Sequence, residues 1–378
     1  MASAAREAHR RKVGLALSGG GFRAVLFHVG ALWRLAELGI LAQLDRVSSV
    51  SGGSIAAGRL ASCWAQWAAD PTVERYRALI ADPLDHFCTQ HVDAVAISRG
   101  ALSPFRTAAD VLEEIYAHDL FDTTLDRLPD HPAFIFCATN MQTGRLFRFS
   151  KKRLADYRLG EIRSPALPLA RAVAASSAFP PMLSPVILKD LGDFQPWDGA
   201  DLNGDPHYTR KIVLADGGVY DNLGLEQVWG RTDFCLVSDA GAPFAVGPNP
   251  GNDWVRQPMR ALDIATDQSR GLRKRWLIDM ANAGRFKGAY WGIDTDIADY
   301  QLSDTMPADP NVVDPLARIR TRLDPFGDAD RGRLTNWGYA LADAAIRKYA
   351  PGLIAHTAPP AWPRPAYRLF HAANGATP

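Results

Sequence analysis

The sequence lacks an excess of either charge, a patterned set of cysteines and a long apolar run. Its 42 Lys and Arg residues balance 41 Asp and Glu residues, so the formal net charge is +1 and nucleic acid is not an expected partner. The four cysteines form no C-x-x-C pair and no Cys/His cluster of metal-ligand spacing. We therefore expect buried free thiols, no metal and no cofactor.

No apolar run reaches the length of about 18 residues that would indicate a membrane span. Residues 1–12 are basic, but the apolar stretch after them is interrupted by Ser18–Gly21 and Arg23, which disqualifies it as a signal-peptide core. These observations predict a cytoplasmic protein, and peripheral contact with a membrane surface is compatible with them. The oligomeric state is not predicted.

The first 70 residues alternate between strand and helix patterns. Residues 13–17 are an apolar run that ends in glycines, and residues 24–38 carry apolar side chains at helical spacing. The next run, 46–50, is predicted to be a second strand and precedes the alanine-rich segment 54–69. This alternation predicts an α/β fold in which helices cover both faces of a mostly parallel central sheet.

The remaining chain suggests one large catalytic domain with additions. Further strands are predicted at 133–139, 145–149, 211–215 and 234–237, and helices at 167–177, 254–283 and 331–349. The Pro/Gly-rich segment 241–251 is the best candidate boundary. The expected division is a flexible N-terminus (1–12), a catalytic core (13–240) with a lid or insertion (70–131), a C-terminal helical extension packed on the core (241–350) and a Pro-rich tail (351–378).

The segment Ser49-Val50-Ser51-Gly52-Gly53 lies between a predicted strand and a predicted helix. It fits the G-x-S-x-G nucleophile elbow, in which small neighbours allow a strained turn and expose the hydroxyl, except that Ser49 replaces the first glycine. Ser51 is the predicted nucleophile. Ser54, one turn into the helix, is a rival, and a plain helix-capping role for Ser51 is the simplest alternative.

The glycine run Gly19-Gly20-Gly21 presents backbone N–H groups at the start of a helix. Such groups stabilise the oxyanion of acyl transfer, so the run is a candidate oxyanion hole together with Phe22 and with Gly52 after the nucleophile. The same run matches G-x-G-x-x-A, a dinucleotide fingerprint. That alternative requires an acid at the end of the second strand, where this chain has Ser49-Val50-Ser51.

A serine nucleophile requires a base, and Asp216 is the best-placed candidate. It ends a buried strand and is followed by Gly217 and Gly218, which leave room for a substrate, and burial would raise its pKa toward that of a general base. The alternative is a Ser-Asp-His triad that uses Asp216 or Asp239 with His356 or His371. Both histidines lie in or near the Pro-rich tail, a poor platform for a triad.

Several polar residues near these motifs have simpler structural explanations. Arg23 is expected to bond loop carbonyls rather than an anionic headgroup, and Asp221-Asn222 to cap the segment 223–229. His28 is expected to be a satisfied core histidine, and Asp239 to support the site. The basic stretch 270–275 is expected to be a solvated helix face rather than a lipid-binding one.

Taken together, these motifs resemble the patatin-like phospholipase family, whose members combine a glycine-rich oxyanion loop, a G-x-S-x-G elbow and a D-G-[AG] motif. Here they are Ser18–Arg23, Ser49–Gly53 and Asp216-Gly217-Gly218, in the family's order, and 174–182 resembles the family's segment between elbow and aspartate. The resemblance covers about residues 13–240. It implies a three-layer α/β/α fold and a Ser51/Asp216 catalytic dyad without histidine or metal.

The resemblance implies a serine acyl hydrolase that cleaves lipid carboxylic esters through an acyl-enzyme on Ser51. The oxyanion loop is then Gly19–Phe22 with Gly52, and Arg23, Gly53, Gly217 and Gly218 have supporting roles. Phospholipids, lysophospholipids and fatty acyl esters are eligible substrates. The alternative from another class is a lipid- or nucleotide-binding module that keeps the fold without turnover.

Overall fold

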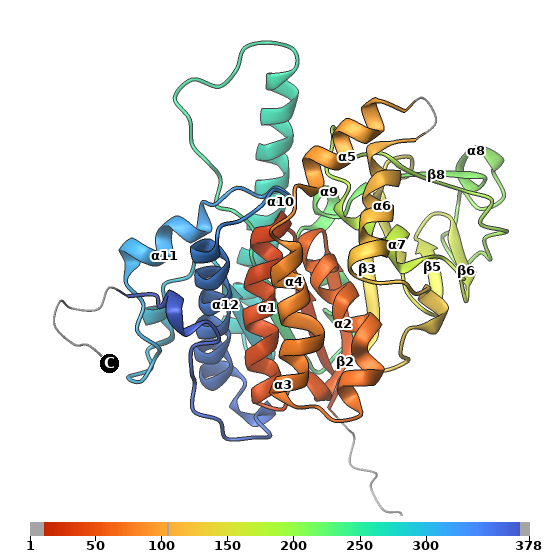
Figure 1. Cartoon of the computed structure of the whole chain (residues 1–378). Helices are drawn as coiled ribbons and strands as arrows, with labels where there is room; N and C mark the ends of the chain where they lie inside the picture. Colours follow the sequence, from red (N-terminus) through yellow and green to blue (C-terminus); the bar gives the residue numbers. More distant parts are fainter. Residues whose placement is uncertain (1–10, 104–105, 371–378) are drawn as a thin grey trace, which may run out of the picture.

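The computed structural model describes residues 11–103 and 106–370, and its centre is a ten-stranded sheet. Strands β10, β9, β1, β2 and β3 are parallel neighbours, and the remaining strands extend the sheet from β3 in antiparallel pairs. Helices α1, α2 and α12 lie side by side over one face (Figure 1). The opposite face is covered by α10, whose Leu277 packs against Ala16 of β1 and Val237 of β9. The predicted three-layer fold with parallel central strands is confirmed.

All ten strands of the sheet are short, with four to eight residues each. Their bounds are β1 (Val13–Leu17), β2 (Leu44–Val50), β3 (Ala133–Asn140), β4 (Arg145–Phe149), β5 (Arg153–Asp156), β6 (Gly160–Arg163), β7 (Val186–Lys189), β8 (Lys211–Asp216), β9 (Phe234–Asp239) and β10 (Gly288–Gly292).

The α-helices range from single turns to the 27 residues of α10. Their bounds are α1 (Gly21–Glu37), α2 (Gly52–Ala68), α3 (Val73–Tyr76), α4 (Asp82–Phe87), α5 (Val92–Ala101), α6 (Ala108–Asp119), α7 (Leu169–Ser177), α8 (Pro206–Thr209), α9 (Gly218–Asp221), α10 (Arg256–Asn282), α11 (Pro310–Ala317) and α12 (Asp328–Tyr349). None of the helices among the described residues combines the length and the apolar character needed to cross a membrane.

The unit β1–α1–β2–α2 positions the candidate site. Both strands run in the same direction, with Leu17 of β1 opposite Ser49 of β2, so the turns that follow them meet at one edge of the sheet. All five residues of β1 are buried, and so are sixteen of α1, because this unit has other elements on both sides. The Gly19–Gly21 turn and Ser51 are therefore brought together by the fold.

The chain after residue 240 contributes more than helices. It supplies β10, which pairs with β9 at the edge of the parallel sheet, and α12, which lies along α1 (Figure 1). The segment 240–255 and the first turns of α10 project beyond the body of the molecule. The tail packs onto α12, where the Asn336 side chain donates to the carbonyl groups of Arg364 and Tyr367. Residues 371–378 of the predicted Pro-rich tail lie outside the described residues.

Two glycines allow α1 and α12 to approach backbone to backbone. A Cβ on Gly338 of α12 would lie 1.9 Å from the carbonyl oxygen of Phe27, and one on Gly30 of α1 would lie 1.8 Å from that of Thr335. Both contacts are with backbone, which cannot rotate away as a side chain can. The helix pair therefore has no room for larger residues at these positions.

Gly338→Ala is expected to lower the free energy of unfolding by about 3 kcal/mol, because the helices must move apart. Gly271→Ala is the matched control, since its Cβ would lie 3.4 Å from the flexible end of Arg275 and alanine favours helix by up to about 1 kcal/mol. Urea unfolding followed by circular dichroism measures both. Equal stability of the Gly338→Ala variant and the native protein would contradict the close packing.

Candidate active site

Ser51 occupies a strained turn between β2 and α2. Its backbone has φ 51° and ψ −122°, a positive φ that is uncommon outside glycine. Ser51 stands at the N-cap position of α2, yet its side chain makes no capping hydrogen bond. The hydroxyl instead borders a cavity of about 700 Å³. The structure thus gives Ser51 the geometry of a nucleophile elbow and not that of a helix cap.

The two other serines of this segment form a buried cluster beneath the turn. The Ser54 hydroxyl donates to Oγ of Ser49 at 3.0 Å and lies 2.8 Å from Oγ of Ser176. Ser49 in turn donates to the carbonyl oxygen of Ile135 at 3.3 Å. All three hydroxyls are satisfied inside the protein. This explains why a serine fits where the elbow pattern has glycine, and it gives Ser54 a structural role.

Asp216 ends β8, and its side chain lies in the wall of the same cavity. The residue is 2% exposed, and Oδ1 accepts a hydrogen bond from the backbone N–H of Gly218 at 2.7 Å. Burial raises the pKa of this carboxyl to about 7, and hydrogen bonds from Gly218 and the Ser51 hydroxyl act in the opposite direction. Asp216 is therefore a carboxyl that exchanges a proton near neutral pH.

The contact between Ser51 and Asp216 is close but incomplete. The Ser51 hydroxyl lowers the pKa of Asp216, whereas Oδ2 of Asp216 has no hydrogen-bond partner of ordinary geometry among the described residues. The two observations agree if the hydroxyl lies near the carboxylate at an angle that is poor for a full hydrogen bond.

The end of α7 holds the serine and the aspartate in place. The carbonyl oxygen of Ser176 accepts hydrogen bonds from the N–H groups of both Ser51 and Gly217, each at 3.2 Å. The carbonyl oxygen of Ala178 accepts from the N–H of Asp216 at 2.9 Å. The Ala-Ala-Ser-Ser-Ala segment thus joins two turns that are far apart in the sequence.

The glycine run lies directly beside Ser51. A Cβ on Gly19 would be 3.0 Å from that of Ser51, and one on Gly52 would be 2.2 Å from the carbonyl oxygen of Gly21. Gly20 has φ 142° and Gly21 has φ 57°, values that favour glycine. These conformations turn the start of α1 toward the serine.

Five N–H groups were predicted to form the oxyanion hole. Those of Gly19 and Phe22 already donate to the carbonyl oxygens of Asn222 and Arg322, at 3.0 and 3.1 Å. The N–H groups of Gly20, Gly21 and Gly52 donate to no acceptor within the described part of the chain. Three donors therefore remain available, and Gly20 and Gly21 line the cavity.

Arg23 and His28 are both buried and have structural partners. The Arg23 guanidinium donates to the carbonyl oxygens of Ala240, Ala317 and Ile319, at distances of 2.6 to 3.2 Å. Burial lowers the pKa of His28 to about 4, and its ring bonds Ser18 and Ser238. These contacts agree with the structural explanations expected for both residues.

Asp239 and Asp221 anchor the helix α10. Asp239 is fully buried and pairs with Arg270 at 2.9 Å, and the Arg270 guanidinium holds the pKa of Asp239 below its usual range despite burial. Arg273 pairs with Asp221 at 3.3 Å, and Lys274 with Asp294 at 3.3 Å.

Asp221 also accepts hydrogen bonds from the N–H groups of Leu223 and Glu226, so it caps the turn that follows. That turn is the short 3₁₀ segment η4 (Leu225–Gln227) rather than the longer helix expected there. The basic stretch of α10 is therefore used largely in ion pairs within the molecule.

The histidine alternative finds no support in the described structure. His356 packs against Gly39, just after the C-terminal end of α1, while Gly21 and Ser51 lie at its N-terminal end about 25 Å away. His371 lies outside the described residues. No histidine lines the cavity that contains Ser51. In the described part of the chain no cluster of His, Cys, Asp or Glu is arranged to hold a metal.

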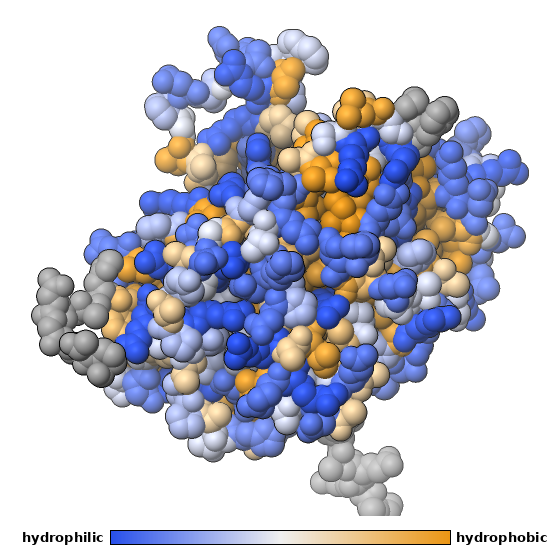
Figure 2. Space-filling model, viewed as in Figure 1, coloured by the Kyte–Doolittle hydropathy of each residue, from blue (hydrophilic) through white to orange (hydrophobic). Residues whose placement is uncertain are grey.

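The cavity has an apolar side and a charged rim. Figure 2 shows hydrophobic residues gathered beside the projecting part of α10. The segment Phe179–Leu183 and Ile97 of α5 supply apolar lining, and α10 supplies Arg260, Asp263 and Asp267. Helices α5 and α10 thus face the site from two regions that are distant in the sequence.

Three parts of the candidate site were not predicted in these roles from the sequence. Asp93 of α5 lines the cavity, and burial raises its pKa. The 321–323 segment covers the glycine loop, since a Cβ on Gly21 would lie 2.4 Å from the carbonyl oxygen of Thr321. Asn222 was expected to cap a helix but holds Gly19 through its carbonyl group. Only Asn222 had a usable signal, its position just after the D-G-G motif.

The model of one protein family, described as patatin-like phospholipase, matches residues 15–229, which is more than half of the chain. The chain belongs to this family. Its patatin-like core thus contains the glycine run, Ser51 and Asp216 in a single match. Membership supports lipid acyl hydrolase activity.

Solved structures similar to this patatin-like chain include human GIVD cytosolic phospholipase A2 in complex with methyl gamma-linolenyl fluorophosphonate. The identity is 14% and the TM-score 0.50, with 91% of this chain and 59% of that chain covered. VipD from Legionella pneumophila is 16% identical, with a TM-score of 0.39 and coverage of 90% and 67%. At 14% identity the likeness to the human protein shows the fold alone. The chain spans about three fifths of the human protein's chain. No curated protein sequence matches it.

Proposed function

We propose that this patatin-like chain is a serine acyl hydrolase that cleaves carboxylic esters of phospholipids, lysophospholipids or related fatty acyl esters. Ser51 is the nucleophile and Asp216 its general base. The observation that carries the proposal is the pairing of an uncapped, strained serine with a buried carboxyl of pKa about 7 in one cavity.

The proposed first step is attack of the Ser51 oxygen on the ester carbonyl carbon. The hydroxyl proton passes to Asp216, whose Oδ2 has no other partner among the described residues. The tetrahedral intermediate collapses, the alcohol leaves with the proton returned by Asp216, and the acyl group remains on Ser51. Water, activated by Asp216 in the same way, then releases the fatty acid and restores the enzyme.

The N–H groups of Gly20, Gly21 and Gly52 are the proposed oxyanion donors. Their other acceptors are absent from the described structure, and they stand at the N-terminal ends of α1 and α2. Helix ends of this kind favour a negative charge. Each such donor typically contributes about 10²- to 10³-fold to the rate of acyl transfer. Gly19 and Phe22 then serve as supports rather than donors, and Arg23, Gly53, Gly217 and Gly218 shape the surrounding turns.

The acyl chain is proposed to lie along the apolar lining from Phe179 to Leu183. The cavity volume of about 700 Å³ is within the range of small-molecule sites. We further propose that α5, within the 70–131 insertion, and the projecting part of α10 act as a cover over this lining. Both elements contribute residues to the cavity wall.

A fluorophosphonate tests the proposal directly, because it reacts with an activated serine and leaves a stable phosphonyl group. The similar human protein was solved with methyl gamma-linolenyl fluorophosphonate, and we expect the same reagent to label Ser51. Intact-mass spectrometry should show one adduct, and peptide mapping should place it on the peptide that contains Ser51. Loss of p-nitrophenyl ester hydrolysis should follow the labelling one to one.

Prior unfolding in urea provides the control, since it should prevent labelling by separating Ser51 from Asp216. An adduct on another residue, or full labelling without any loss of ester hydrolysis, would be inconsistent with Ser51 as the nucleophile.

A further inference from the structure

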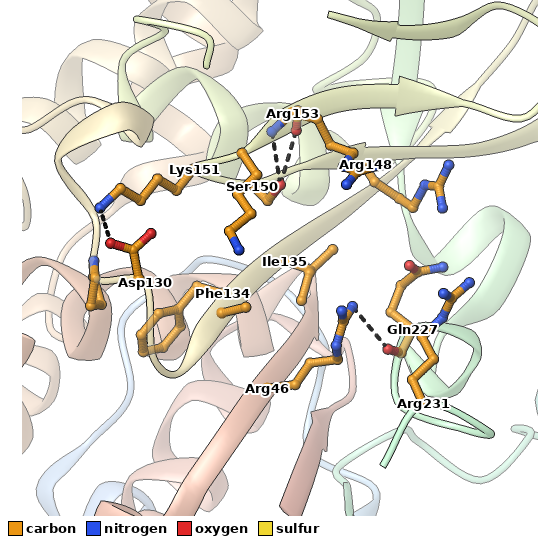
Figure 3. A pocket seen from close by; sticks show the side chains of 13 residues that line it. Arg46, Asp130, Phe134, Ile135, Arg148, Ser150, Lys151, Arg153, Gln227 and Arg231 are labelled. Atoms are coloured by element: carbon orange, nitrogen blue, oxygen red, sulfur yellow. Dashed lines mark hydrogen bonds and ion pairs between the residues drawn. The ribbon is translucent and has the colours of Figure 1, made fainter. Parts of the chain in front are cut away.

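A second cavity, of about 170 Å³, lies between the start of β3, the turn from β4 to β5 and the segment after η4. Figure 3 shows that side chains from these separate elements meet around it. One acidic side chain, Asp130, lines the cavity. Six basic side chains line it: Arg46, Arg148, Lys151, Lys152, Arg153 and Arg231. We call this the basic cavity, and it concentrates positive charge in a chain whose formal net charge is only +1.

Two of the six cations already have carboxylate partners. Lys151 pairs with Asp130 at 3.0 Å, and Arg153 pairs with Glu161 at 2.5 Å (Figure 3 shows the first pair). Glu226 also acts on Arg148 through its charge but forms no ion pair with it. The remaining positive charge is not neutralised by the two ion pairs.

Arg46, Arg148 and Arg231 form no ion pair with any carboxylate in the part of the chain that the structure describes. Nη1 of Arg46 donates to the carbonyl oxygen of Gln227 at 3.3 Å. The guanidinium of Arg148 lies 5.4 Å from the centre of the Trp197 ring. A guanidinium has five donors, so most donors of these three arginines remain available.

The arginines also oppose one another. Burial lowers the pKa of Arg46 and of Arg148, and repulsion from Arg231 lowers both further. Gathering like charges in a partly buried place costs free energy, which an anion in the cavity would recover. This arrangement is unfavourable for the empty protein and favourable for a protein with a bound anion.

The size of the cavity limits what the anion can be. About 170 Å³ is smaller than the range of roughly 300–1,000 Å³ that encloses a whole drug-sized ligand. It has room for one tetrahedral group with a few waters, at about 30 Å³ for each water. Guanidinium groups match the oxygens of phosphate in geometry as well as in charge.

The basic cavity and the Ser51 cavity lie at opposite ends of the parallel strands. Arg46 is near the start of β2 and Ser51 follows its end, about 16 Å away along the strand. Ile135, near the start of the parallel neighbour β3, lines the basic cavity as well. A flat lipid surface docked at the Ser51 cavity therefore does not reach the basic cavity.

We propose that the basic cavity binds a phosphate group carried by a small soluble molecule, with Arg46, Arg148 and Arg231 as its principal ligands. The same chemistry could be presented by a lipid headgroup, but the position of the cavity favours the soluble source. This site is separate from the proposed acyl hydrolysis and does not depend on it.

The test is isothermal titration calorimetry of the full chain with inorganic phosphate, at an ionic strength held constant with sodium chloride. Arg148→Gln and Arg231→Gln should each weaken phosphate binding by at least about tenfold, the loss expected for one charge-assisted contact. Arg210→Gln removes an exposed charge outside the cavity and should bind phosphate as the native protein does. The proposal is overturned if the native protein binds phosphate no more tightly than chloride. It is also overturned if Arg148→Gln and Arg231→Gln both bind phosphate as tightly as the native protein does.

Thermal unfolding separates a binding role from a structural one. Without phosphate, Arg231→Gln and Arg148→Gln should melt no lower than the native protein, because each removes a charge that has no carboxylate partner. With phosphate, the native protein should gain melting temperature and the variants should not. Arginines that merely hold the fold together would lower the melting temperature equally in both buffers, which would contradict the proposal.

Sedimentation with vesicles distinguishes the two sources of phosphate. Vesicles of phosphatidylcholine with and without phosphatidic acid are compared, because phosphatidic acid presents a phosphate monoester at the surface. The Arg148→Gln and Arg231→Gln variants should sediment with both as the native protein does. Arginine-dependent binding to the phosphatidic acid vesicles, without binding of free phosphate, would overturn the soluble source.

Discussion

Ser51→Ala is expected to reduce kcat/KM for ester hydrolysis by at least about 10⁴-fold, to the level of the oxyanion donors and substrate binding alone. The reason is chemical, because no other hydroxyl in the cavity wall has both a strained turn beneath it and a buried carboxyl beside it. Hydrolysis of p-nitrophenyl butyrate and of a phosphatidylcholine substrate measures the effect. A non-catalytic lipid-binding module would keep its lipid binding and show no hydrolysis to lose.

Ser54→Ala is the matched control three residues away. Its hydroxyl bonds Ser49 and Ser176, so its loss should cost about 1 kcal/mol of stability and leave most of the activity. Ser51→Gly adds a second control, since glycine accepts the positive φ of this turn and should raise stability by about 1 kcal/mol while abolishing turnover. Activity lost in Ser54→Ala and kept in Ser51→Ala would assign the nucleophile to the rival serine.

Asp216→Asn is expected to lower kcat/KM by about 10³-fold, because an amide has the same shape but cannot accept the hydroxyl proton. The pH dependence of kcat/KM for the native protein should show the titration of the same carboxyl group. Since the pKa of Asp216 is about 7, kcat/KM should be constant above that pH and fall tenfold for each pH unit below it. The residual activity of Asp216→Asn should lack this dependence.

The same substitution should make the protein more stable. The pKa of Asp216 is raised above its ordinary value of 3.8, so the folded state holds this proton more tightly than the unfolded state. The stability that this proton contributes is fully present at low pH and is lost as the pH rises from about 4 to 7. Above pH 7 the buried charge of Asp216 costs the folded state on the order of 4 kcal/mol. At pH 8, Asp216→Asn should therefore raise the free energy of unfolding by roughly 1 to 3 kcal/mol.

Urea unfolding at pH 5 and pH 8 measures this effect, and the gain should be larger at pH 8. Asp221→Asn is a suitable comparison, because that buried carboxylate pairs with Arg273 and caps a turn, so its loss should destabilise at both pH values. An active Asp216→Asn protein would exclude Asp216 as the base.

The parallel half of the fold was predictable because local and global preferences agree there. Residues 13–17 are an apolar run, both 13–17 and 46–50 lead into glycine-containing turns, and the structure forms strands at Val13–Leu17 and Leu44–Val50. Strands β5, β6, β7 and β10 were not predicted, although β1 and β4, which are similarly short, were. These segments form strands because they pair with neighbouring strands, a contact that their own sequences do not encode.

The candidate site divides in the same way. Ser51 and the glycine run follow strands and Asp216 ends one, so spacing and turn chemistry point to them. The shared hydrogen bonds to Ser176 and the covering residues Asp93 and Thr321 depend on contacts over long stretches of chain, which no local pattern encodes. Removing Gly19 and Phe22 from the predicted oxyanion donors required the coordinates too, because their N–H groups bond carbonyls that lie about 200 to 300 positions further along the chain.

A single carbonyl oxygen, that of Ser176, receives both the Ser51 and the Gly217 amide. The serine and the aspartate are consequently fixed to one rigid point, and their separation is decided when the protein folds rather than when a substrate arrives. For the proposed acyl hydrolase, we therefore expect an activator to act on the proposed cover formed by α5 and α10 and to leave the spacing of the two groups unchanged.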